Sequence, residues 1–458
     1  MKNNTNGNSN NLLQGSIARG LFRLAWPMIV AFAFQTSFNF VDRYFVSQLG
    51  SVAIAAIGMA FIVQLILIAL GAGIGMGVNS FISRSIGSGR ESNAVSAALH
   101  SFILALIIGV GFGVTGLLTQ DIIYRALGAE GPLLQAIKEY LTVLFYFSPV
   151  YLMAMTSNNI FRGWGDTVYP MKFMMTGTLL NVILDPLLIY GLWIFPEMGI
   201  KGAALATGLA RMLALCYVLW VLFAKDLPRR FRFRGFKFSS AIIRGIFQVG
   251  LPASAGQILT SFSLSLIFLL LDPFGTDARA AYTIAFTYEM VAFLPVIGIG
   301  QAIAIMTGYN YGARQYDRIK KVYFTGMGLS LGMMFTVSIV ILLAPAVFAG
   351  VFAQSDSVLK ITANALRILA PGYLFNGIFM CTVTSFQGLG LGKYQLYATL
   401  MRMFGLMLPL AYAGSRLYGL QGLWGGILTS TVFMSIIMLV WYWYLYQFQL
   451  TKGKIKTI

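Results

Sequence analysis

Charged residues, cysteine and histidine are all scarce in this chain. Only 10% of its 458 residues are Asp, Glu, Lys or Arg, whereas a soluble domain carries about 25%. The two cysteines, Cys216 and Cys381, fall inside apolar runs, so we expect them to pack as small hydrophobic groups and not as a disulfide. The single histidine, His100, cannot build a metal site alone and is predicted to be structural or interfacial. The composition excludes a soluble enzyme, a disordered protein and a disulfide scaffold.

Long apolar runs fill the chain instead. Hydrophobic residues make up 58% of it. Runs of about 20 apolar residues, the length that crosses a bilayer, follow one another almost to the end. The sequence therefore predicts an all-α integral membrane protein with twelve transmembrane helices, at 21–48, 52–82, 94–118, 133–161, 168–191, 200–224, 241–271, 279–307, 319–343, 358–386, 394–414 and 420–447.

The basic residues are distributed unevenly along this pattern. The 32 Lys and Arg outnumber the 14 Asp and Glu by 18, and 23 of the 32 fall in the two termini and in every second connection. Because cytoplasmic loops carry an excess of Lys and Arg, both termini are predicted in the cytoplasm and the chain in the cytoplasmic (inner) membrane of a prokaryote. The densest basic run, at 225–238, has the composition of a nucleic-acid or lipid-headgroup patch, but its place midway along the chain favours a linker. We therefore predict no nucleic-acid partner.

The two halves of the chain match each other at one constant offset in residue number. The matched positions include Pro27 with Pro252, Gly50 with Gly275, Gly73 with Gly298, Gly87 with Gly312 and Gly163 with Gly388. Six spans in each half make the repeat parallel, as in transporters whose two bundles rock around a cleft; duplication for stability alone is the other interpretation. The predicted organisation is a flexible tail at 1–20, an N-terminal six-helix lobe at 21–224, a basic linker at 225–240, a C-terminal six-helix lobe at 241–447 and a basic tail at 448–458.

Carboxylates inside the predicted spans are the clearest sign of function, because a charge in the hydrocarbon is costly. Span one carries Gln35, Asn39 and Asp42 on one helical face, and span five carries Asn181 and Asp185 four residues apart on one face. The second half has apolar residues at the positions equivalent to both carboxylates, namely Ile267 and Leu410. The polar chemistry of these positions is therefore confined to the first half.

The depth of these groups in their spans is similar. At ~1.5 Å per residue, Asp42 lies about 31 Å along span one and Asp185 about 25 Å along span five, and both spans start on the cytoplasmic side. Span six starts on the outer side, and Thr207 lies about 10 Å along it. If the helices converge, these residues and Asn181 make an all-oxygen site suited to Na⁺ or to carboxylates that share a proton. The structural alternatives are that Asp185 caps a helix end and that Thr207 bonds its own helix backbone.

Two further charged residues lie inside the spans. Glu289, about 15 Å into span eight, is a candidate second functional acid. Arg211 in span six is either its partner or the partner of an acid in the first half.

Nucleotide-driven and enzymatic chemistry find no support in the sequence. The glycine-rich run at 71–77 lacks a preceding strand and a following lysine, and GLGLGK, ending at Lys393, has Gln387 where a phosphate-binding loop requires glycine. A membrane enzyme requires a cluster of His, Ser or metal ligands that the spans do not offer. We predict no enzyme activity and no cofactor apart from a coupling ion, H⁺ or Na⁺.

Several longer motifs carry a family resemblance over nearly the whole chain. They are WPMIVAFAFQTSFNFVDRYFVSQLG at 26–50, GMGVNSFISRSIGSG at 75–89, FRGWGDTVYPM at 161–171, NVILDPLLIYG at 181–191, GIKGAALAT at 199–207 and GYNYGARQYDR at 308–318. With them the chain resembles the multidrug and toxic compound extrusion (MATE) family. The span-five motif and the acid in span one resemble the prokaryotic branch named for a DNA-damage-inducible member (DinF-like).

The resemblance implies twelve helices in two pseudo-symmetric lobes and cation-coupled export of amphipathic, often cationic drugs. It also implies a coupling-cation site at Asp42, Asn181, Asp185 and Thr207. The implied substrate cleft includes Gln35, Asn39 and Tyr140, and Glu289 is a partial match to the acids of another branch.

The sequence thus predicts a secondary active multidrug antiporter, working as a monomer, in which H⁺ or Na⁺ entry drives export of small amphipathic or cationic molecules and supports antibiotic resistance. A lipid-linked oligosaccharide flippase of the same superfamily is the alternative, although most Lys and Arg fall in loops and not in a cationic cleft. A passive channel is a third possibility.

Overall fold

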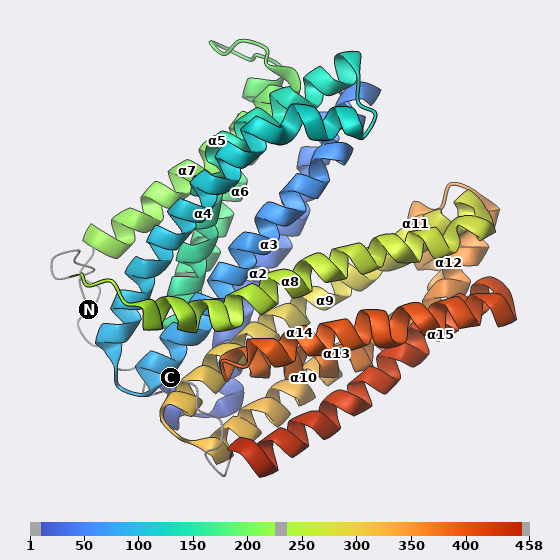
Figure 1. The fold of residues 1–458 in the computed structure, drawn as a ribbon. Coiled ribbons are helices and arrows are strands. Elements are labelled where there is room, and N and C mark those ends of the chain that lie inside the picture. Colours follow the sequence, from blue (N-terminus) through green and yellow to red (C-terminus); the bar gives the residue numbers. More distant parts are fainter. Residues whose placement is uncertain (1–10, 225–235, 451–458) are drawn as a thin grey trace. The chain divides into compact units, whose positions relative to one another are not determined.

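The computed structural model describes residues 11–224 and 236–450, and every regular element in these ranges is helical (Figure 1). The chain builds long helices because apolar runs in a bilayer must satisfy their backbone groups internally. The elements are α2 (Ile17–Ser47), α3 (Ser51–Gly87), α4 (Glu91–Ala126), α5 (Gly131–Gly163), α6 (Val168–Ile189), α7 (Gly199–Ala224), α8 (Ser240–Leu271), α9 (Gly275–Gly312), α10 (Tyr316–Leu343), α11 (Pro345–Phe352), α12 (Asp356–Leu369), α13 (Gly372–Gly388), α14 (Gly392–Leu400) and α15 (Leu408–Leu445).

The described helices account for twelve membrane spans. Nine stretches are long and apolar enough to cross, and a tenth is formed by two helices that meet at a bend. Two of the nine hold two spans each. Ser240–Gly312 turns at Asp272–Phe274, and Gly392–Phe448 turns at Gly419, which has a positive φ of 61° that suits glycine. The prediction of a twelve-helix all-α membrane protein is confirmed.

The predicted span at 358–386 is present but is not one continuous helix. The structure has α12 and α13 there, with a bend of 53° between them. Pro371 lies at the break, and proline lacks the N–H that would continue the backbone ladder. The bend matters for function because α13 carries a polar cluster described below.

Contacts divide the chain into two compact units. One holds Val30–Ile86 and Arg90–Ser254, and the other holds Asn10–Ile29, Gly87–Gly89 and the chain from Ala255 onward. Both α2 and α8 pass from one unit to the other, α2 after Ile29 and α8 after Ser254. These two points are equivalent positions of the sequence repeat, and each comes shortly after a matched proline, Pro27 or Pro252. The predicted lobes divide the chain at the linker instead, and that division stays a prediction.

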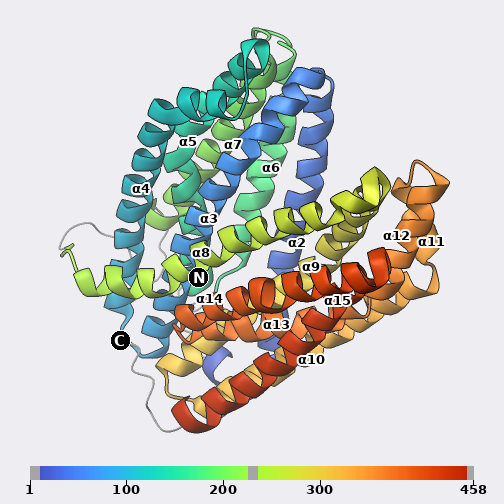
Figure 2. The same ribbon diagram turned by 45° about the vertical axis from the view of Figure 1, so that its right-hand side comes forward.

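In the first unit, α3–α7 form a helical bundle in which α4 packs on α5, α5 on α7 and α6 on α7 (Figures 1 and 2). The first part of α8 joins this bundle through a glycine contact. A Cβ on Gly73 would overlap Ser254 Oγ and lie 2.5 Å from the carbonyl oxygen of Gly250. Ser254 Oγ also donates a hydrogen bond to Ala69 O (2.9 Å). Only glycine lets the two backbones approach this closely.

In the second unit, α9 packs on α10 and α13, and α13 packs on α15 (Figure 2). The first part of α2 joins this bundle through Gly298, the repeat counterpart of Gly73. A Cβ there would lie 2.6 Å from Ile29 Cγ1 and 3.1 Å from Ala25 O. The helix crossing therefore recurs in both units at equivalent residues.

Part of the predicted flexible tail is folded in the second unit. Residues 11–14 are helical and Leu12 is buried. Asn310 Nδ2 donates to Leu12 O (3.4 Å), and Arg318 Nη2 donates to Gly15 O (2.5 Å). Residues 1–10, 225–235 and 451–458, which hold the rest of that tail, most of the linker and most of the basic tail, lie outside the described residues.

The lone histidine holds the start of α8 in the first unit. The backbone N–H of Ser239 donates to His100 Nε2 (2.8 Å), and His100 Nδ1 lies 2.8 Å from Ser96 O, so that Nδ1 carries the proton. The rings of Phe236 and Phe238 lie 4.7 and 5.7 Å from the imidazole. His100 therefore has a structural role, as the sequence predicts.

His100→Leu removes the acceptor for the Ser239 N–H. One lost hydrogen bond is worth about 1 kcal/mol, so we expect the first backbone amides of α8 to exchange with solvent about fivefold faster, measured by hydrogen–deuterium exchange on peptides covering 236–245. Ser96→Ala is the matched control, because it keeps both His100 contacts to the backbone. Unchanged exchange in His100→Leu would contradict the role given to His100.

Candidate functional site

A buried carboxylate on α6 is the centre of the candidate site. Asp185 is 0% exposed, and its Oδ1 accepts a hydrogen bond from Asn181 Nδ2 (2.6 Å), one helical turn earlier. Asp185 Oδ2 is also buried and has no hydrogen-bond partner. Buried polar atoms in proteins are nearly always paired, so this oxygen is available to a small bound cation.

The second predicted carboxylate belongs to the same site. Asp42 lies on the part of α2 that packs in the first unit, is half-buried and acts electrostatically on Asp185. It also acts on the phenol groups of Tyr140 and Tyr151, both on α5. The convergence of span one and span five that the sequence predicts is thus present within one unit.

A basic residue and an amide complete the constellation, which we call the carboxylate site (Asp42, Gln64, Tyr140, Tyr151, Asn181, Asp185 and Arg211). Arg211 Cζ on α7 lies 4.4 Å from the centre of the Tyr151 ring, and Tyr151 also lies in the field of both acids. Gln64 Nε2 on α3 donates to the Tyr140 hydroxyl. The sequence left open where Arg211 pairs; the structure puts it against the Tyr151 ring in the first unit.

The carboxylate site suits a small cation because of its buried oxygen atoms. Asp185 is fully buried, and its Oδ2 has no hydrogen-bond partner. Burying a carboxylate is costly unless its charge is compensated. A proton on the carboxylate and Na⁺ among oxygen atoms both meet this requirement.

The other residues predicted for the cation site and the cleft have varied surroundings. Thr207 Oγ1 donates to Ala203 O of its own helix (3.1 Å), the structural alternative foreseen from the sequence, which leaves its lone pairs available. Gln35 is half-buried on α2, and the side chain of Asn39 lies outside the described part of the chain. Glu289 lies on α9 in the second unit, where its Oε1 accepts from Asn376 Nδ2 (2.9 Å).

Sequence reasoning missed several of these residues. Tyr151 and Asn376 carry no signal in an apolar span, although they occupy equivalent positions of the two halves and so are repeat counterparts. Gln64 and Glu289 are counterparts as well. The constant offset of the repeat could therefore have pointed to both sites.

The sequence assigns the basic residues of alternate connections to loops. For three of these arginines that assignment is wrong. Arg84 and Arg162 are each only 7% exposed, and Arg162 Cζ lies 5.6 Å from the Phe32 ring. Arg402 bonds to Asn376 inside the second unit. Arg84 and Arg162 lie in the last turns of α3 and α5, and Arg402 lies in the π-helical segment Met401–Met407. Packing decides whether such side chains are buried, and a count along the sequence does not reveal it.

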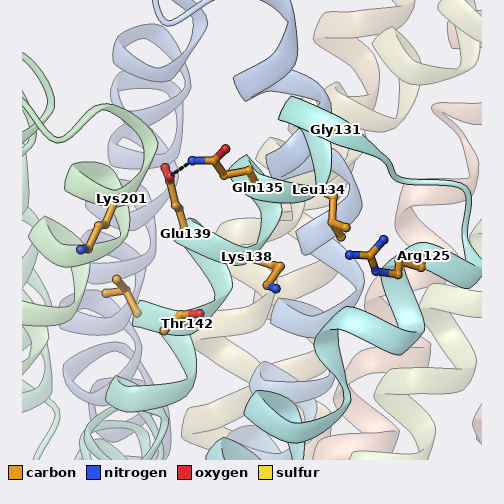
Figure 3. Close-up of a pocket in the computed structure, with 9 residues that line it drawn as sticks. Arg125, Gly131, Leu134, Gln135, Lys138, Glu139, Thr142 and Lys201 are labelled. Atoms are coloured by element: carbon orange, nitrogen blue, oxygen red, sulfur yellow. Dashed lines mark hydrogen bonds between the residues drawn. The ribbon is translucent and has the colours of Figure 1, made fainter.

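A surface pocket of about 510 Å³ lies on the first unit among α4, α5 and α7 (Figure 3). Arg125, Lys138 and Lys201 line it, and Gln135 donates to Glu139 (3.0 Å). Asp121 forms ion pairs of 2.8 Å with both Arg125 and Lys138. Because the exposed Asp121 is already paired with Arg125 and Lys138, we do not consider this pocket a candidate site for the coupling ion.

Comparison with known proteins identifies relatives along nearly the full chain. The MatE family model matches residues 27–187 and again 252–413, so that its two matches start at the paired prolines of the repeat. Two relatives are the FAD transporter of Shewanella oneidensis (27% identity, 93% of this chain and 94% of the relative) and the probable multidrug resistance protein NorM of Thermotoga maritima (28% identity, 93% and 92%). A third is the multidrug export protein MepA of Staphylococcus aureus (26% identity, 93% and 94%).

Solved structures agree with this result. An outward-facing multidrug resistance MATE transporter of the MOP superfamily superposes with a TM-score of 0.91 at 31% identity, over 96% of this chain and 98% of that one. A MOP superfamily transporter from Pyrococcus furiosus gives a TM-score of 0.89 at 30% identity, over 97% and 98%. The chain is a multi-pass membrane transporter, not an enzyme, and it belongs to the MATE family.

Proposed function

We propose that this transporter is a secondary active multidrug exporter, which moves small amphipathic or cationic molecules outward in exchange for H⁺ or Na⁺. The observation that carries the proposal is the fully buried Asp185, whose Oδ2 has no hydrogen-bond partner. The coupling cation binds at Asp42, Asn181 and Asp185, with Thr207 contributing an oxygen lone pair. The DinF-like branch, in which the acids lie in the first half, is the one that this arrangement supports.

Coupling requires that the cation and the substrate favour different states of the transporter. α2 is the helix suited to this exchange, because it carries Asp42, contains Pro27 and passes between the two units after Ile29. Neutralising Asp42 and Asp185 changes the electrostatic energy of the outer part of α2 against α6, and the proline permits bending. Two solved MATE structures, each at 30% identity with a TM-score of 0.91, are described as bent and straight.

The proposed substrates are amphipathic because the polar groups of the cleft are few. In the first unit, Gln35, Asn39 and Tyr140 are the polar residues that we propose for it. NorM and MepA are named for multidrug resistance and export, which favours this cargo, while the FAD transporter indicates that relatives differ in cargo. A lipid-linked oligosaccharide flippase remains the second candidate, favoured by the buried Arg84 and Arg162.

We place the protein in the cytoplasmic membrane of a prokaryote with both termini in the cytoplasm. It works as a monomer without an organic cofactor and without nucleic acid. The positive charge of alternate loops supports this orientation.

Efflux of a fluorescent cationic dye from proteoliposomes tests the proposal. We expect dye movement under an imposed pH gradient or an imposed Na⁺ gradient, and none when both gradients are collapsed by ionophores. Dye movement that matches protein-free liposomes under both gradients, across a panel of amphipathic dyes, would refute the drug-export proposal. Movement independent of any gradient would instead indicate a passive channel.

A further inference from the structure

The second unit holds a polar cluster of its own, built on three helical segments. Glu289 on α9 accepts from Asn376 Nδ2 on α13 (2.9 Å), and Asn376 Oδ1 accepts from Arg402 Nη2. Among the contacts of the described residues, the carboxylate and the guanidinium are joined through this amide and form no ion pair of their own. Each charged group therefore keeps bonding capacity that the protein leaves unused, because a guanidinium has five N–H donors.

The backbone around Arg402 is unusual. Met401–Met407 is π-helical, between α14 and α15. Such segments are rare and are found most often at functional sites, since the extra residue per turn redirects side chains. Here it presents Arg402 to Asn376 and over the Phe379 ring, whose centre lies 4.5 Å from Cζ. The α12–α13 bend, just before Gly372, sets the direction of the helix that carries Asn376 and Phe379.

Aromatic residues with unused donors surround Glu289. Tyr282 and Tyr373 both lie in its electrostatic field. The hydroxyl of Tyr373, which is 1% exposed, has no hydrogen-bond partner, and neither has Trp424 Nε1, although Trp424 stacks on Tyr282 with ring centres 5.7 Å apart. The Tyr373 hydroxyl is thus an unpaired buried donor near the carboxylate, and such donors are nearly always paired, which favours a bound group that supplies an acceptor.

The charges within this cluster balance. One carboxylate and one guanidinium cancel, so the cluster has no net demand for a lone cation. A purely cationic ligand at Glu289 would face Arg402, and a purely anionic ligand at Arg402 would face Glu289. A ligand that carries both charges can pair with Glu289 and with Arg402. A ligand with one charge is disfavoured because it faces a like charge, and such repulsion creates specificity.

We infer that Glu289, Asn376 and Arg402 form a paired-charge binding site for a dipolar aromatic substrate, with its cationic group on Glu289, its carboxylate or phosphate on Arg402 and its ring on Phe379. This inference rests on the proposed function and narrows the substrate class of that export. Arg402 is the specificity-determining residue, because in this site it is the group that binds the anionic part of the substrate.

The test uses two aminoxanthylium dyes that differ only in a free benzoate or its methyl ester. We expect the purified transporter to bind the free acid about tenfold more tightly than the ester, measured by fluorescence anisotropy, because a charge-assisted hydrogen bond is worth about 1.5–3 kcal/mol. Arg402→Gln should weaken binding of the acid about tenfold but should not weaken binding of the ester, for which it removes only a repelling charge. Arg416→Gln is the matched control, since Arg416 also lies over a ring, that of Tyr412 (5.3 Å), at an exposed position.

Equal binding of acid and ester by the unmodified transporter would overturn the inference without any variant. So would an unchanged preference for the acid in Arg402→Gln. Glu289→Gln gives a second, independent variant, which should weaken both dyes because both carry the cation. Gradient-driven efflux of the ester distinguishes failure of the binding site from failure of the exporter proposal. If the ester is exported but the transporter binds the acid no more tightly than the ester, the exporter proposal stands and the paired-charge site is refuted.

Discussion

Asp185→Asn is expected to abolish gradient-driven export. Asparagine keeps the shape of the side chain but removes the charge, and with it the buried carboxylate oxygen that the proposed cation binds. Neither an inward pH gradient nor an inward Na⁺ gradient should move dye faster than protein-free liposomes do. Asp42→Asn should have the same effect, because Asp42 acts on Asp185 within the same site.

Matched controls separate loss of coupling from loss of fold. Asp272→Asn removes an exposed carboxylate that pairs with Arg279 (2.7 Å), and we expect it to export normally. Asp185→Asn should still bind dye at equilibrium, because the cation site is not the proposed dye contact. If Asp185→Asn and Asp42→Asn both retained full coupled export, the first unit would not hold the coupling site.

Gly73→Ala is expected to cause the largest loss of stability. Its Cβ would overlap Ser254 Oγ and lie 2.5 Å from the backbone oxygen of Gly250, so α3 and α8 must separate. Overpacking of a tight contact costs about 1–3 kcal/mol. We expect a clear fall in the thermal unfolding temperature in detergent and reduced export, since the contact lies where α8 passes between units.

Two further variants test the cause of that loss. Gly58→Ala is the matched control on the same helix, because no atom lies within 4 Å of its added Cβ. It should be neutral or slightly stabilising, as alanine favours helix over glycine. Ser254→Gly in the Gly73→Ala background removes the nearest atom but leaves the Gly250 oxygen, so we expect a partial rescue. A Gly73→Ala protein as stable as the unmodified one would show that the two helices are free to separate.

The resemblance between the two halves also has a physical consequence for where polar groups lie. The counterparts Gln64 and Glu289 both bond to α5 or to its repeat partner α13, yet only the second is charged. Their neighbours differ accordingly, since Arg211 reaches Tyr151 from α7 whereas Arg402 reaches Asn376 from the π-helical segment. The same repeat position thus carries an arginine contact in each unit, supplied by different helices.

The sequence by itself determined the number of spans, most of their bounds and the acids of the first half. Apolar length decides the first two, because a helix needs about 20 apolar residues to cross the bilayer and helices satisfy their own backbone groups there. The cost of burying charge decides the third, since Asp42, Asp185 and Glu289 stand out in an apolar background. These are local properties that need no knowledge of neighbours.

Only the tertiary structure decided which polar groups meet. Tyr151, Asn376 and Arg402 are ordinary in sequence and acquire their roles from helix direction: the bend at Pro371, the π-helical turn at Met401 and the reach of long arginine side chains. The exchange of the first parts of α2 and α8 between units was equally invisible, because it depends on close approach at Gly73 and Gly298. Contacts between distant segments follow from packing geometry, which hydropathy and spacing along one chain do not encode.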